Sequence, residues 1–557
     1  MGMSARTRTT LLLTLISALF FLPFLGGVHL FDWDEINFAE IAREMIVTGQ
    51  YLEPQIHYEF FTEKPPMFMW LQALSMLIFG VGEYASRFPN ALMGVVVIPF
   101  LYRLGYRLHG HRFGVFWALA FFGSILPHLY FKSGIIDPIF NFFIFLGILG
   151  LIRFHWTREQ NDGKGTIKWL ILAGVSTGIA VLVKGPVAYL ITSIVLGVYF
   201  VIKRFRFFIT IPQFLIYSIV VAGVTGIWFG LNYLSVGPTF ITEFTIRQWE
   251  LFSTPDAGHG GFPGYHFVVL LLGCFPVSVF ALRGMFRVQD PQLKGGVRER
   301  DMRLWMLILF YVVLILFTIV KSKIVHYSSL AYYPLTYLGA WTVVRILDGS
   351  IKFKGWMKGL LIGIASLPIL LTIVLPYFGK NIEQLRPLFS ADPFAMENLN
   401  AEVQWTWDGS LAGLWLLGVM ITFFLLLRNH PKRSFQTLFL GTGVWVTLTL
   451  VMYINKIESI SQRAAIEFWQ GLQGKEVYVH TYGYKSYAHL FYSSVMPVEN
   501  EKYTDQEWLF HGDIDRPVYV SMKVTSRQRF EEENPDFEFL YDKNGFYFYV
   551  RKPALAN

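Results

Sequence analysis

The segment that decides the fold runs from Phe31 to Met69 and reads FDWDEINFAEIAREMIVTGQYLEPQIHYEFFTEKPPMFM. It directly follows the first long apolar run, yet it is rich in charged side chains. These are Asp32, Asp34, Glu35, Glu40, Arg43, Glu44, Glu53, Glu59, Glu63 and Lys64. Ionisable groups held against a bilayer are expensive, so by default they mark a functional site. We interpret residues 31–66 as an extracytoplasmic loop that forms half of an active site.

The composition of the 557-residue chain is that of a membrane protein. Only 15% of its residues are charged, against about 25% in soluble domains, and 54% are hydrophobic. Apolar runs of roughly 17–25 residues, long enough to cross a bilayer as helices, recur from Leu11 to Tyr453. The single cysteine, Cys274, excludes an intrachain disulfide framework and a cysteine-based metal site. The net charge of +8 lies in short loops, which indicates topology rather than nucleic-acid binding.

The apolar runs predict about thirteen spanning helices within residues 1–454. Arg6 and Arg8 precede the first run, which we interpret as an uncleaved span with a cytoplasmic start. The alternation of spans then places the basic clusters inside and leaves a small charged group outside. That group consists of Asp34, Glu63, Lys64, Asp137, Lys184, Arg247, His259, Lys321 and Lys323.

Residues 455–557 have the composition of a soluble domain. Helical periodicity covers residues 460–472, and a second helix is predicted over residues 526–533. Segments rich in Val, Tyr and Phe predict strands over residues 476–481, 517–521, 537–541 and 545–551. The sequence therefore predicts an all-α polytopic membrane domain followed by a small α/β domain outside the membrane.

The candidate residues of the first loop also have structural explanations. Asp34 begins a predicted amphipathic helix that ends at Gly49, and an N-cap is an ordinary role for aspartate there. Neighbours on a helix project about 100° apart, so Asp34 and Glu35 are expected to have different roles. Glu63 and Lys64 precede two prolines that keep the chain extended and begin a helix. A solvated ion pair at an interfacial turn is the alternative at that position.

A second set of candidates lies in later loops. They are Asp137 before Pro138, Arg247 and His259 in the polar loop 234–264, and Lys321, Lys323, His326 and Tyr327. Aspartate before proline is common at helix starts, and lysine at an interface can simply snorkel into water. A lone histidine is usually structural, and no short-range spacing supports a metal site in the polar loop.

Together these groups predict one outward-facing cavity with carboxylates on one side and cations on the other. A hydroxyl acceptor needs a carboxylate base within hydrogen-bond reach. An anionic leaving group needs fixed cations where its charge develops. A lipid-phosphate donor would place its tail between helices and its phosphate on Lys64, Lys321 or Lys323.

Three motifs resemble the bacterial ArnT-type enzymes: DEINFAEIAREM from Asp34, EKPPMFMWLQAL from Glu63 and RFPNALMG from Arg87. These enzymes are the aminoarabinose transferases within the wider protein O-mannosyltransferase superfamily, which has the GT-C glycosyltransferase fold. The resemblance covers roughly Leu11 to Ala340. It implies an inverting transferase that uses a polyprenyl-phosphate sugar at the periplasmic face of the bacterial inner membrane.

The resemblance also implies site residues. Asp34 matches the catalytic first-loop aspartate, Asp137 the second aspartate, and Lys64 a phosphate-facing lysine. Glu63 and His259 match residues that would allow a divalent metal such as zinc. Arg247 and the stretch from Lys321 to Lys323 also have counterparts in the family, and we predict Glu35, Arg247, Lys321, Lys323, His326 and Tyr327 as substrate-binding residues. The family usually continues Leu-Pro-x-Tyr after the lysine, whereas this chain has Ile324-Val325-His326-Tyr327.

We therefore predict a glycosyltransferase that moves one sugar from a polyprenyl-phosphate donor to a lipid A, glycolipid or protein acceptor, without nucleic-acid partners. Asp34 would bind and activate the acceptor, and Lys64, Lys321 and Lys323 would hold the donor phosphate. Asp137 would orient Lys64 or the sugar. The alternatives are an oligosaccharide ligase of the same fold, a non-catalytic scaffold, and a flippase for lipid-linked glycans. A flippase would need ionisable groups at mid-membrane and repeated, interrupted spans.

Overall fold

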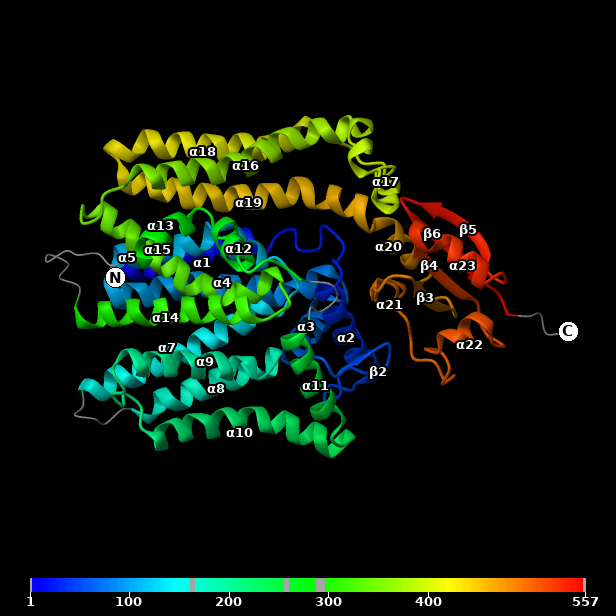
Figure 1. Ribbon diagram of the computed structural model, residues 1–557, viewed down its shortest axis with the longest axis horizontal. Helices are drawn as coiled ribbons and strands as arrows, with labels where there is room; N and C mark the ends of the chain where they lie inside the picture. Colours follow the sequence, from blue (N-terminus) through cyan, green and yellow to red (C-terminus); the bar gives the residue numbers. More distant parts are fainter. Residues whose placement is uncertain (1–2, 161–165, 255–259, 287–295, 554–557) are drawn as a thin grey trace.

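The computed structural model describes residues 3–160, 166–254, 260–286 and 296–553. Long helices lie side by side in a bundle, with the N-terminus at one end (Figure 1). The opposite end carries α2 (Asp34–Thr48), α11 (Thr239–Ser253) and the C-terminal domain. We call this the loop end of the bundle.

The bundle contains most of the helices of the chain. They are α1 (Ala5–Phe21), α4 (Glu83–His109), α5 (His111–Phe122), α6 (Ile125–Tyr130), α7 (Asp137–Gln160), α8 (Ile167–Lys184), α9 (Val187–Ile202), α10 (Ile211–Val236), α12 (Tyr265–Gly273), α13 (Val277–Met285), α14 (Val297–Ile319), α15 (Tyr332–Leu347), α16 (Gly355–Lys380), α18 (Ser410–Asn429) and α19 (Pro431–Ser461). Each of the predicted spans coincides with one of these helices or with an interrupted pair of them.

Eight of the described helices are long and apolar enough to cross a membrane. Three other predicted spans are the shorter helices α1, α9 and α15, of 17, 16 and 16 residues. The last two are the pairs α5–α6 and α12–α13. Between α5 and α6, a Cβ on Gly123 would lie 2.1 Å from the Phe439 carbonyl oxygen, so glycine allows close contact with α19. Between α12 and α13, Pro276 lacks the N–H that a continuous helix requires.

The polar segment predicted from the sequence forms its own layer at the loop end. The helix α2 is followed by a short hairpin, β1 (Gln55–Ile56) and β2 (Glu59–Phe60), and by α3 (Met67–Phe79). Every residue of α2 from Glu35 to Met45 is buried, including its charged side chains. Gly49 ends the helix in the left-handed region, with φ of 72°, where glycine is favoured.

The C-terminal domain is a four-stranded sheet covered by helices on both faces. Its elements are α20 (Arg463–Gln470), β3 (Tyr478–Tyr482), α21 (Ala488–Ser493), α22 (Gln506–His511), β4 (Val518–Lys523), η6 (Val524–Ser526), α23 (Arg527–Glu533), β5 (Glu538–Lys543) and β6 (Phe546–Arg551). The strand order is β3-β4-β6-β5, with β3 parallel to β4 and the other pairs antiparallel. All four predicted strands and both predicted helices are present, whereas α21 and α22 are not foreseen by the sequence.

The two faces of this sheet belong to different hydrophobic cores. Phe548 packs with Phe468 of α20 in the core that continues into the bundle. Val520 and Met522 pack with Phe530 of α23 in a separate core. The domain is thus packed onto the loop end through one face of its sheet. Between α16 and α18 lie the short helices η3 (Ile382–Gln384), η4 (Arg386–Phe389), α17 (Pro393–Asn398) and η5 (Trp407–Gly409).

Candidate active site

A cavity of about 1250 Å³ lies at the loop end, where α2 meets the ends of the bundle helices. It is lined by nine of the charged or polar residues singled out by the sequence. These are Asp34, Glu35, Glu63, Lys64, Asp137, Lys184, Arg247, His326 and Tyr327. Residues from the first loop, from the α6–α7, α8–α9 and α14–α15 connections and from α11 therefore share one space.

Asp34 presents its carboxylate to this cavity. It is the first residue of α2, where a negative charge interacts favourably with the helix dipole, and its side chain is 30% exposed. The N-cap residue is Trp33, whose side chain makes no capping hydrogen bond. Asp34 is therefore not the N-cap, and its carboxylate is available to a ligand.

Glu35 also lines the cavity, but its carboxylate is engaged by protein donors. Arg87 donates from Nε to Oε1 at 3.0 Å and from Nη2 to Oε2 at 2.7 Å. The backbone N–H groups of Phe31 and Gly134 donate at 3.0 and 2.5 Å. Burial opposes ionisation, but Arg87 and the two amides prevail and hold the pKa of Glu35 below its usual value. All four hydrogen bonds come from donors inside the protein, so the Glu35 carboxylate is already satisfied without a substrate.

Asp137 and Lys184 form a buried ion pair on the cavity wall. Lys184 Nζ lies 2.7 Å from Asp137 Oδ1, and the Asp137 side chain is only 2% exposed. The pair forms because α7 begins at Asp137 and α8 ends at Lys184, where Gly185 has φ of 124° and Pro186 starts the turn into α9. In the sequence Lys184 is a single cation before Gly-Pro, and the ion pair with Asp137 gives that cation a fixed position.

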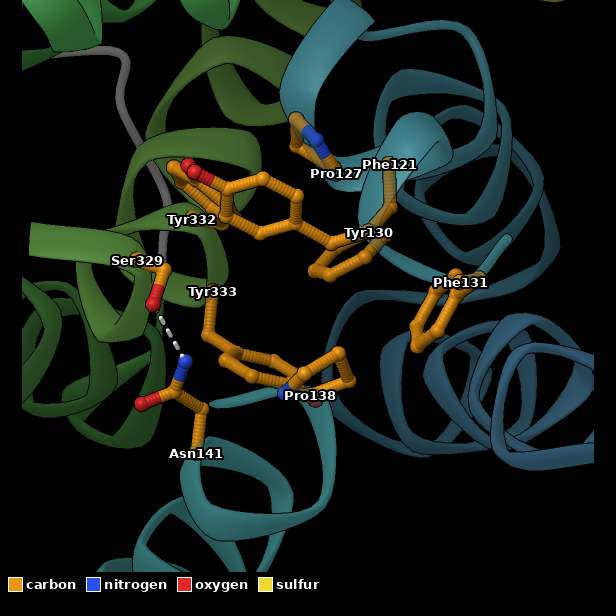
Figure 2. Close-up of a pocket in the computed structure, with 9 residues that line it drawn as sticks. All are labelled: Phe121, Pro127, Tyr130, Phe131, Pro138, Asn141, Ser329, Tyr332 and Tyr333. Atoms are coloured by element: carbon orange, nitrogen blue, oxygen red, sulfur yellow. Dashed lines mark hydrogen bonds between the residues drawn. The ribbon is translucent and has the colours of Figure 1, made fainter. Parts of the chain in front are cut away.

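The floor beneath Asp137 is aromatic. Tyr130, Tyr332 and Tyr333 surround an apolar void of about 20 Å³ next to Pro138 (Figure 2). On the same side, Asn141 Nδ2 donates to Ser329 Oγ at 2.7 Å and joins α7 to η2 (Val325–Ala331). This contact fixes the start of α7, and hence Asp137, relative to η2.

Lys64 lines the same cavity as the cations Lys184 and Arg247. Its Nζ donates to the carbonyl of Glu63 at 3.2 Å, and the Glu63 carboxylate lies 3.6 Å from Arg247 Nε. Burial lowers the pKa of Lys64; Lys184 and Arg247 act in the same direction, and Glu63 and Asp34 oppose them. Cations held this close together favour an anionic ligand, because its charge relieves their mutual repulsion.

Lys321 and Lys323 do not line the cavity in the described part of the chain. Lys321 is exposed. Lys323 Nζ instead donates to the carbonyls of Phe317, Thr318 and Val320 at 3.1, 2.7 and 2.5 Å. These carbonyls lie at the C-terminus of α14, where a cation satisfies groups that have no partner in the helix.

The predicted metal site involves a residue that the structure does not describe. His259 lies in the gap 255–259, outside the described residues. Within the described ranges, no group of three or more His, Cys, Asp and Glu side chains is close enough to hold a metal ion. Glu63 pairs with Arg247 instead. The zinc site therefore remains a prediction from the sequence.

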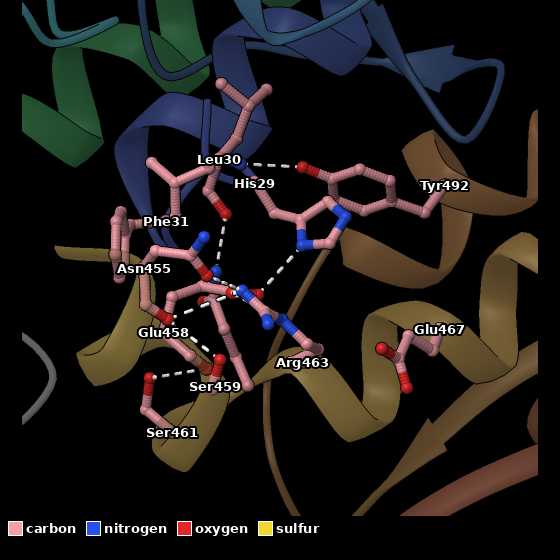
Figure 3. Close-up of polar contacts among 12 residues, drawn as sticks. His29, Leu30, Phe31, Asn455, Glu458, Ser459, Ser461, Arg463, Glu467 and Tyr492 are labelled. Atoms are coloured by element: carbon pink, nitrogen blue, oxygen red, sulfur yellow. Dashed lines mark hydrogen bonds and ion pairs between the residues drawn. The ribbon is translucent and has the colours of Figure 1, made fainter. Parts of the chain in front are cut away.

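The C-terminal part of the chain holds the start of the first loop (Figure 3). Glu458, near the end of α19, is fully buried and binds His29 Nδ1 at 2.8 Å and Arg463 Nε at 2.8 Å. Tyr492 OH accepts a hydrogen bond from the Leu30 amide at 2.6 Å. These contacts fix residues 29–30, which lead directly into the cavity wall.

Further contacts extend from this junction along α2 and the hairpin. Ser486 donates to the carboxylate of Asp32, and Arg43 donates to the Val495 carbonyl at 2.8 Å. Tyr503 OH donates to the His57 carbonyl at 2.6 Å. These partners lie more than 400 residues apart in sequence, so no local pattern could have indicated them.

Two sets of apolar side chains, which we call the apolar walls, also line the cavity. One combines Phe24, Leu25 and Val28 after α1 with Leu450 and Ile454 of α19. The other combines Val187 and Leu190 of α9 with Phe317, Val320 and Ile324 around the end of α14. Apolar surface at the level of the bundle helices suits hydrocarbon chains.

Comparisons with known proteins agree with this architecture. Residues 63–228 match the family described as dolichyl-phosphate-mannose-protein mannosyltransferase. The structure is similar over the full length of both chains to the crystal structure of ArnT from Cupriavidus metallidurans bound to undecaprenyl phosphate, with a TM-score of 0.76 and 18% identity. The chain has the GT-C fold of ArnT. The apo form of the same ArnT gives a TM-score of 0.72 at 17% identity over 98% of both chains.

ArnT-like sequences among the curated relatives carry one name, undecaprenyl phosphate-alpha-4-amino-4-deoxy-L-arabinose arabinosyl transferase. The protein of that name from Edwardsiella ictaluri is 26% identical over 66% of this chain and 65% of its own length. The one from Pectobacterium atrosepticum is 24% identical over 73% of this chain and 74% of its own length. The match to the first relative thus spans just under two thirds of that protein.

Proposed function

We propose that this ArnT-like chain is an inverting glycosyltransferase that moves one sugar from a polyprenyl-phosphate donor to an acceptor. One observation carries the proposal. The carboxylates of Asp34 and Asp137 share a cavity with the cations of Lys64, Lys184 and Arg247 and with the two apolar walls. This combination offers contacts for an acceptor, a leaving phosphate and a lipid tail.

The cations support a polyprenyl-phosphate donor. When the bond between the sugar and the phosphate breaks, negative charge develops on the phosphate oxygens, and Lys64, Lys184 and Arg247 stabilise it. The lipid tail lies along an apolar wall of the cavity. The curated relatives are named for undecaprenyl phosphate, and the similar crystal structure contains it. Undecaprenyl phosphate is therefore the carrier to test first.

The carboxylates support the acceptor side. The Asp34 side chain is partly exposed in the cavity and binds and positions the acceptor, while Asp137 holds Lys184 in place. Attack on the anomeric carbon from the side opposite the phosphate inverts its configuration in a single displacement. The acceptor is to be sought among lipid A, another glycolipid and a protein.

The distribution of basic residues supports a periplasmic site in the bacterial inner membrane. The end of the bundle opposite the loop end carries Arg6, Arg8, Arg103, Arg107, Arg153, Arg204, Arg283, Arg345 and Arg428. Basic residues accumulate on the cytoplasmic side of membrane proteins. The loop end, with the cavity and the C-terminal domain, then faces the periplasm.

The test uses purified protein in nanodiscs with a labelled undecaprenyl-phosphate sugar and extracted acceptors. Asp34→Asn and Lys64→Ala should each lower turnover by about 10²–10³, as expected when a group that stabilises the transition state is removed. Glu538→Gln, at an exposed ion pair with Lys552, is the control and should behave like wild type. Wild-type turnover in both cavity variants would remove the assignment.

A cellular experiment identifies the acceptor. Mass spectrometry of lipid A, other glycolipids and envelope glycoproteins from cells with and without the gene should show one class that loses a sugar. Chelation by EDTA, followed by the return of zinc alone, tests the metal prediction in the same transfer assay. An unchanged rate after chelation would reject that metal.

A further inference from the structure

His326 lies between the two aspartates of the cavity. Its Nε2 atom is 3.8 Å from Asp34 Oδ2 and 3.9 Å from Asp137 Oδ2. The aspartates come from α2 and α7, so the imidazole on η2 joins the two parts of the site. Both distances exceed a direct hydrogen bond, but a movement of less than 1 Å would form one. Catalytic hydrogen bonds are often this long before substrate binds.

Only one of the two carboxylate oxygens of Asp137 has a hydrogen-bond donor among the described residues. Lys184 binds Oδ1 at 2.7 Å, whereas Oδ2 is buried and accepts no hydrogen bond from any described residue. A buried acceptor without a donor costs about 1–3 kcal/mol. This oxygen is the one that faces His326, so a proton gained by the imidazole during the reaction would satisfy it.

The backbone of His326 is fixed relative to Asp137. Ser329 donates to the His326 carbonyl, and Asn141 donates to Ser329 Oγ at 2.7 Å (Figure 2). Asn141 lies one turn below Asp137 on α7, and Ser329 lies one turn beyond His326 on η2. The pairs Asn141–Ser329 and Asp137–His326 therefore lie one helical turn apart between α7 and η2. The hydrogen bond of the first pair sets the distance between the two side chains of the second.

We propose that His326 accepts the proton of a hydroxyl acceptor during sugar transfer, an inference that rests on the proposed function. The O–H proton of the acceptor moves to Nε2 while the acceptor oxygen bonds to the anomeric carbon. The bond from that carbon to the phosphate oxygen breaks, and its electron pair leaves with the polyprenyl phosphate, which Lys64 and Lys184 stabilise. Asp34 and Asp137 stabilise the imidazolium, which then returns its proton to water.

The surroundings of His326 suit this role. The groups that face it are Asp34, Asp137, Lys64, Lys184 and the ring of Tyr327, whose centroid lies 5.3 Å away. Burial lowers the pKa of His326; Asp137 and Asp34 oppose that shift, and Lys184 and Lys64 add to it. The net shift favours the neutral imidazole, which is the form that can take a proton.

A base at this position indicates the chemical class of the acceptor. A hydroxyl oxygen becomes a strong nucleophile only as it loses its proton, so it benefits from a base in the transition state. A phosphate oxygen is already anionic at neutral pH and gains nothing from one. His326 therefore favours a hydroxyl-bearing acceptor over a phosphate.

The experiment compares His326→Gln, which keeps an amide nitrogen near the Nε2 position, with the exposed control His430→Gln. The values of kcat and KM are measured against pH with hydroxyl-bearing and phosphomonoester acceptors. For His326→Gln we expect kcat to fall about 10²–10⁴-fold with the donor KM unchanged. Because the pKa of His326 is lowered, the wild type should lose kcat/KM on the acid side of the usual imidazole value of about 6.5. This loss should disappear in His326→Gln and persist in His430→Gln. Ser329 only positions His326, so Ser329→Ala should lower kcat while the loss of kcat/KM in acid remains.

Several results would overturn the assignment. One is a His326→Gln enzyme within about threefold of wild type that retains the loss of kcat/KM in acid. Another is efficient transfer to a phosphomonoester that does not depend on His326. Loss of undecaprenyl phosphate binding in His326→Gln, measured by thermal shift, would make His326 a donor ligand instead. If the wild type transfers sugar to neither acceptor, the proposed function fails and this assignment fails with it.

Discussion

Replacing Glu35 by glutamine should destabilise the protein strongly, although the change removes one charge and almost no volume. Glu35 and Arg87 are 6% and 4% exposed. Arg87 uses all five of its N–H donors, two on Glu35 and three on the carbonyls of Leu25, Val28 and His29. The pair therefore fixes the segment between α1 and α2.

The size of this destabilisation follows from the hydrogen bonds that a glutamine amide cannot accept. Each oxygen of Glu35 accepts two hydrogen bonds, so either orientation of glutamine places its NH₂ group against two donors. The guanidinium of Arg87 also loses its counter-charge inside the protein. Breaking a buried pair in this way costs about 3–5 kcal/mol. Arg87→Lys keeps the charge but has at most three donors, so it should also be destabilising, by at least about 2 kcal/mol.

The assay is unfolding of the purified proteins in mixed micelles, followed by near-ultraviolet circular dichroism. The exposed pair of Glu538 and Lys552 supplies the matched control, and Glu538→Gln should cost less than about 1 kcal/mol. The pKa of Glu35 is lowered in the folded protein, so its contribution is complete above the unfolded value near 4.5 and is lost as pH falls through the folded value. The gap between wild type and Glu35→Gln should therefore close in acid. Equal stability of wild type and Glu35→Gln at pH 7 would refute the reasoning.

Three other predictions concern how the cavity is held. Glu458→Gln should cost about 1–3 kcal/mol, because the carboxylate is fully buried while its partners His29 and Arg463 are partly exposed. Limited proteolysis should then cleave before α2, and unchanged cleavage would contradict this. Burial lowers the pKa of His57 to about 4, so docking of the C-terminal domain should weaken as pH falls from about 6.5 towards 4, and hydrogen exchange should show it. A His57→Gln variant should lack that part of the pH dependence. Lys323→Ala should lower the free energy of unfolding by about 1–3 kcal/mol, because three carbonyls lose their hydrogen-bond donor. Lys321→Ala should leave stability and binding of the sugar donor unchanged. A loss of sugar-donor binding in Lys321→Ala alone would contradict this distinction.

The predictable part of the fold is what hydrophobic periodicity determines. The spans, the four C-terminal strands and the polar first loop follow from run lengths and alternation, which depend on neighbouring residues alone. The predicted spans that prove short or interrupted depend on contacts instead. Gly123, for example, reads as an ordinary residue in an apolar run until the backbone of Phe439 is known to lie against it.

The site is predictable only as a set of charges on one side of the membrane. Topology places Lys184 and Lys323 on the same side, but only Lys184 faces the cavity, because Lys323 caps the end of α14. The expectation that Asp34 and Glu35 differ is consistent with the structure. Both line the cavity, but the Glu35 carboxylate is held by Arg87, 52 residues away, a contact that no local pattern indicates. The sequence offers no signal for the C-terminal contacts, and Lys485 of that domain also lines the cavity.

The junction of His29 with Glu458 links residues 429 positions apart, and it has a consequence for how the protein is made. A ribosome delivers the first loop first, and the partners that immobilise it emerge more than 400 residues later. Until then the loop is tethered at one side only, and the reaction chamber lacks a finished wall. Maturation of the cavity is thereby tied to synthesis of residues 458–503, so a chain terminated before them would insert into the membrane with the first loop unanchored.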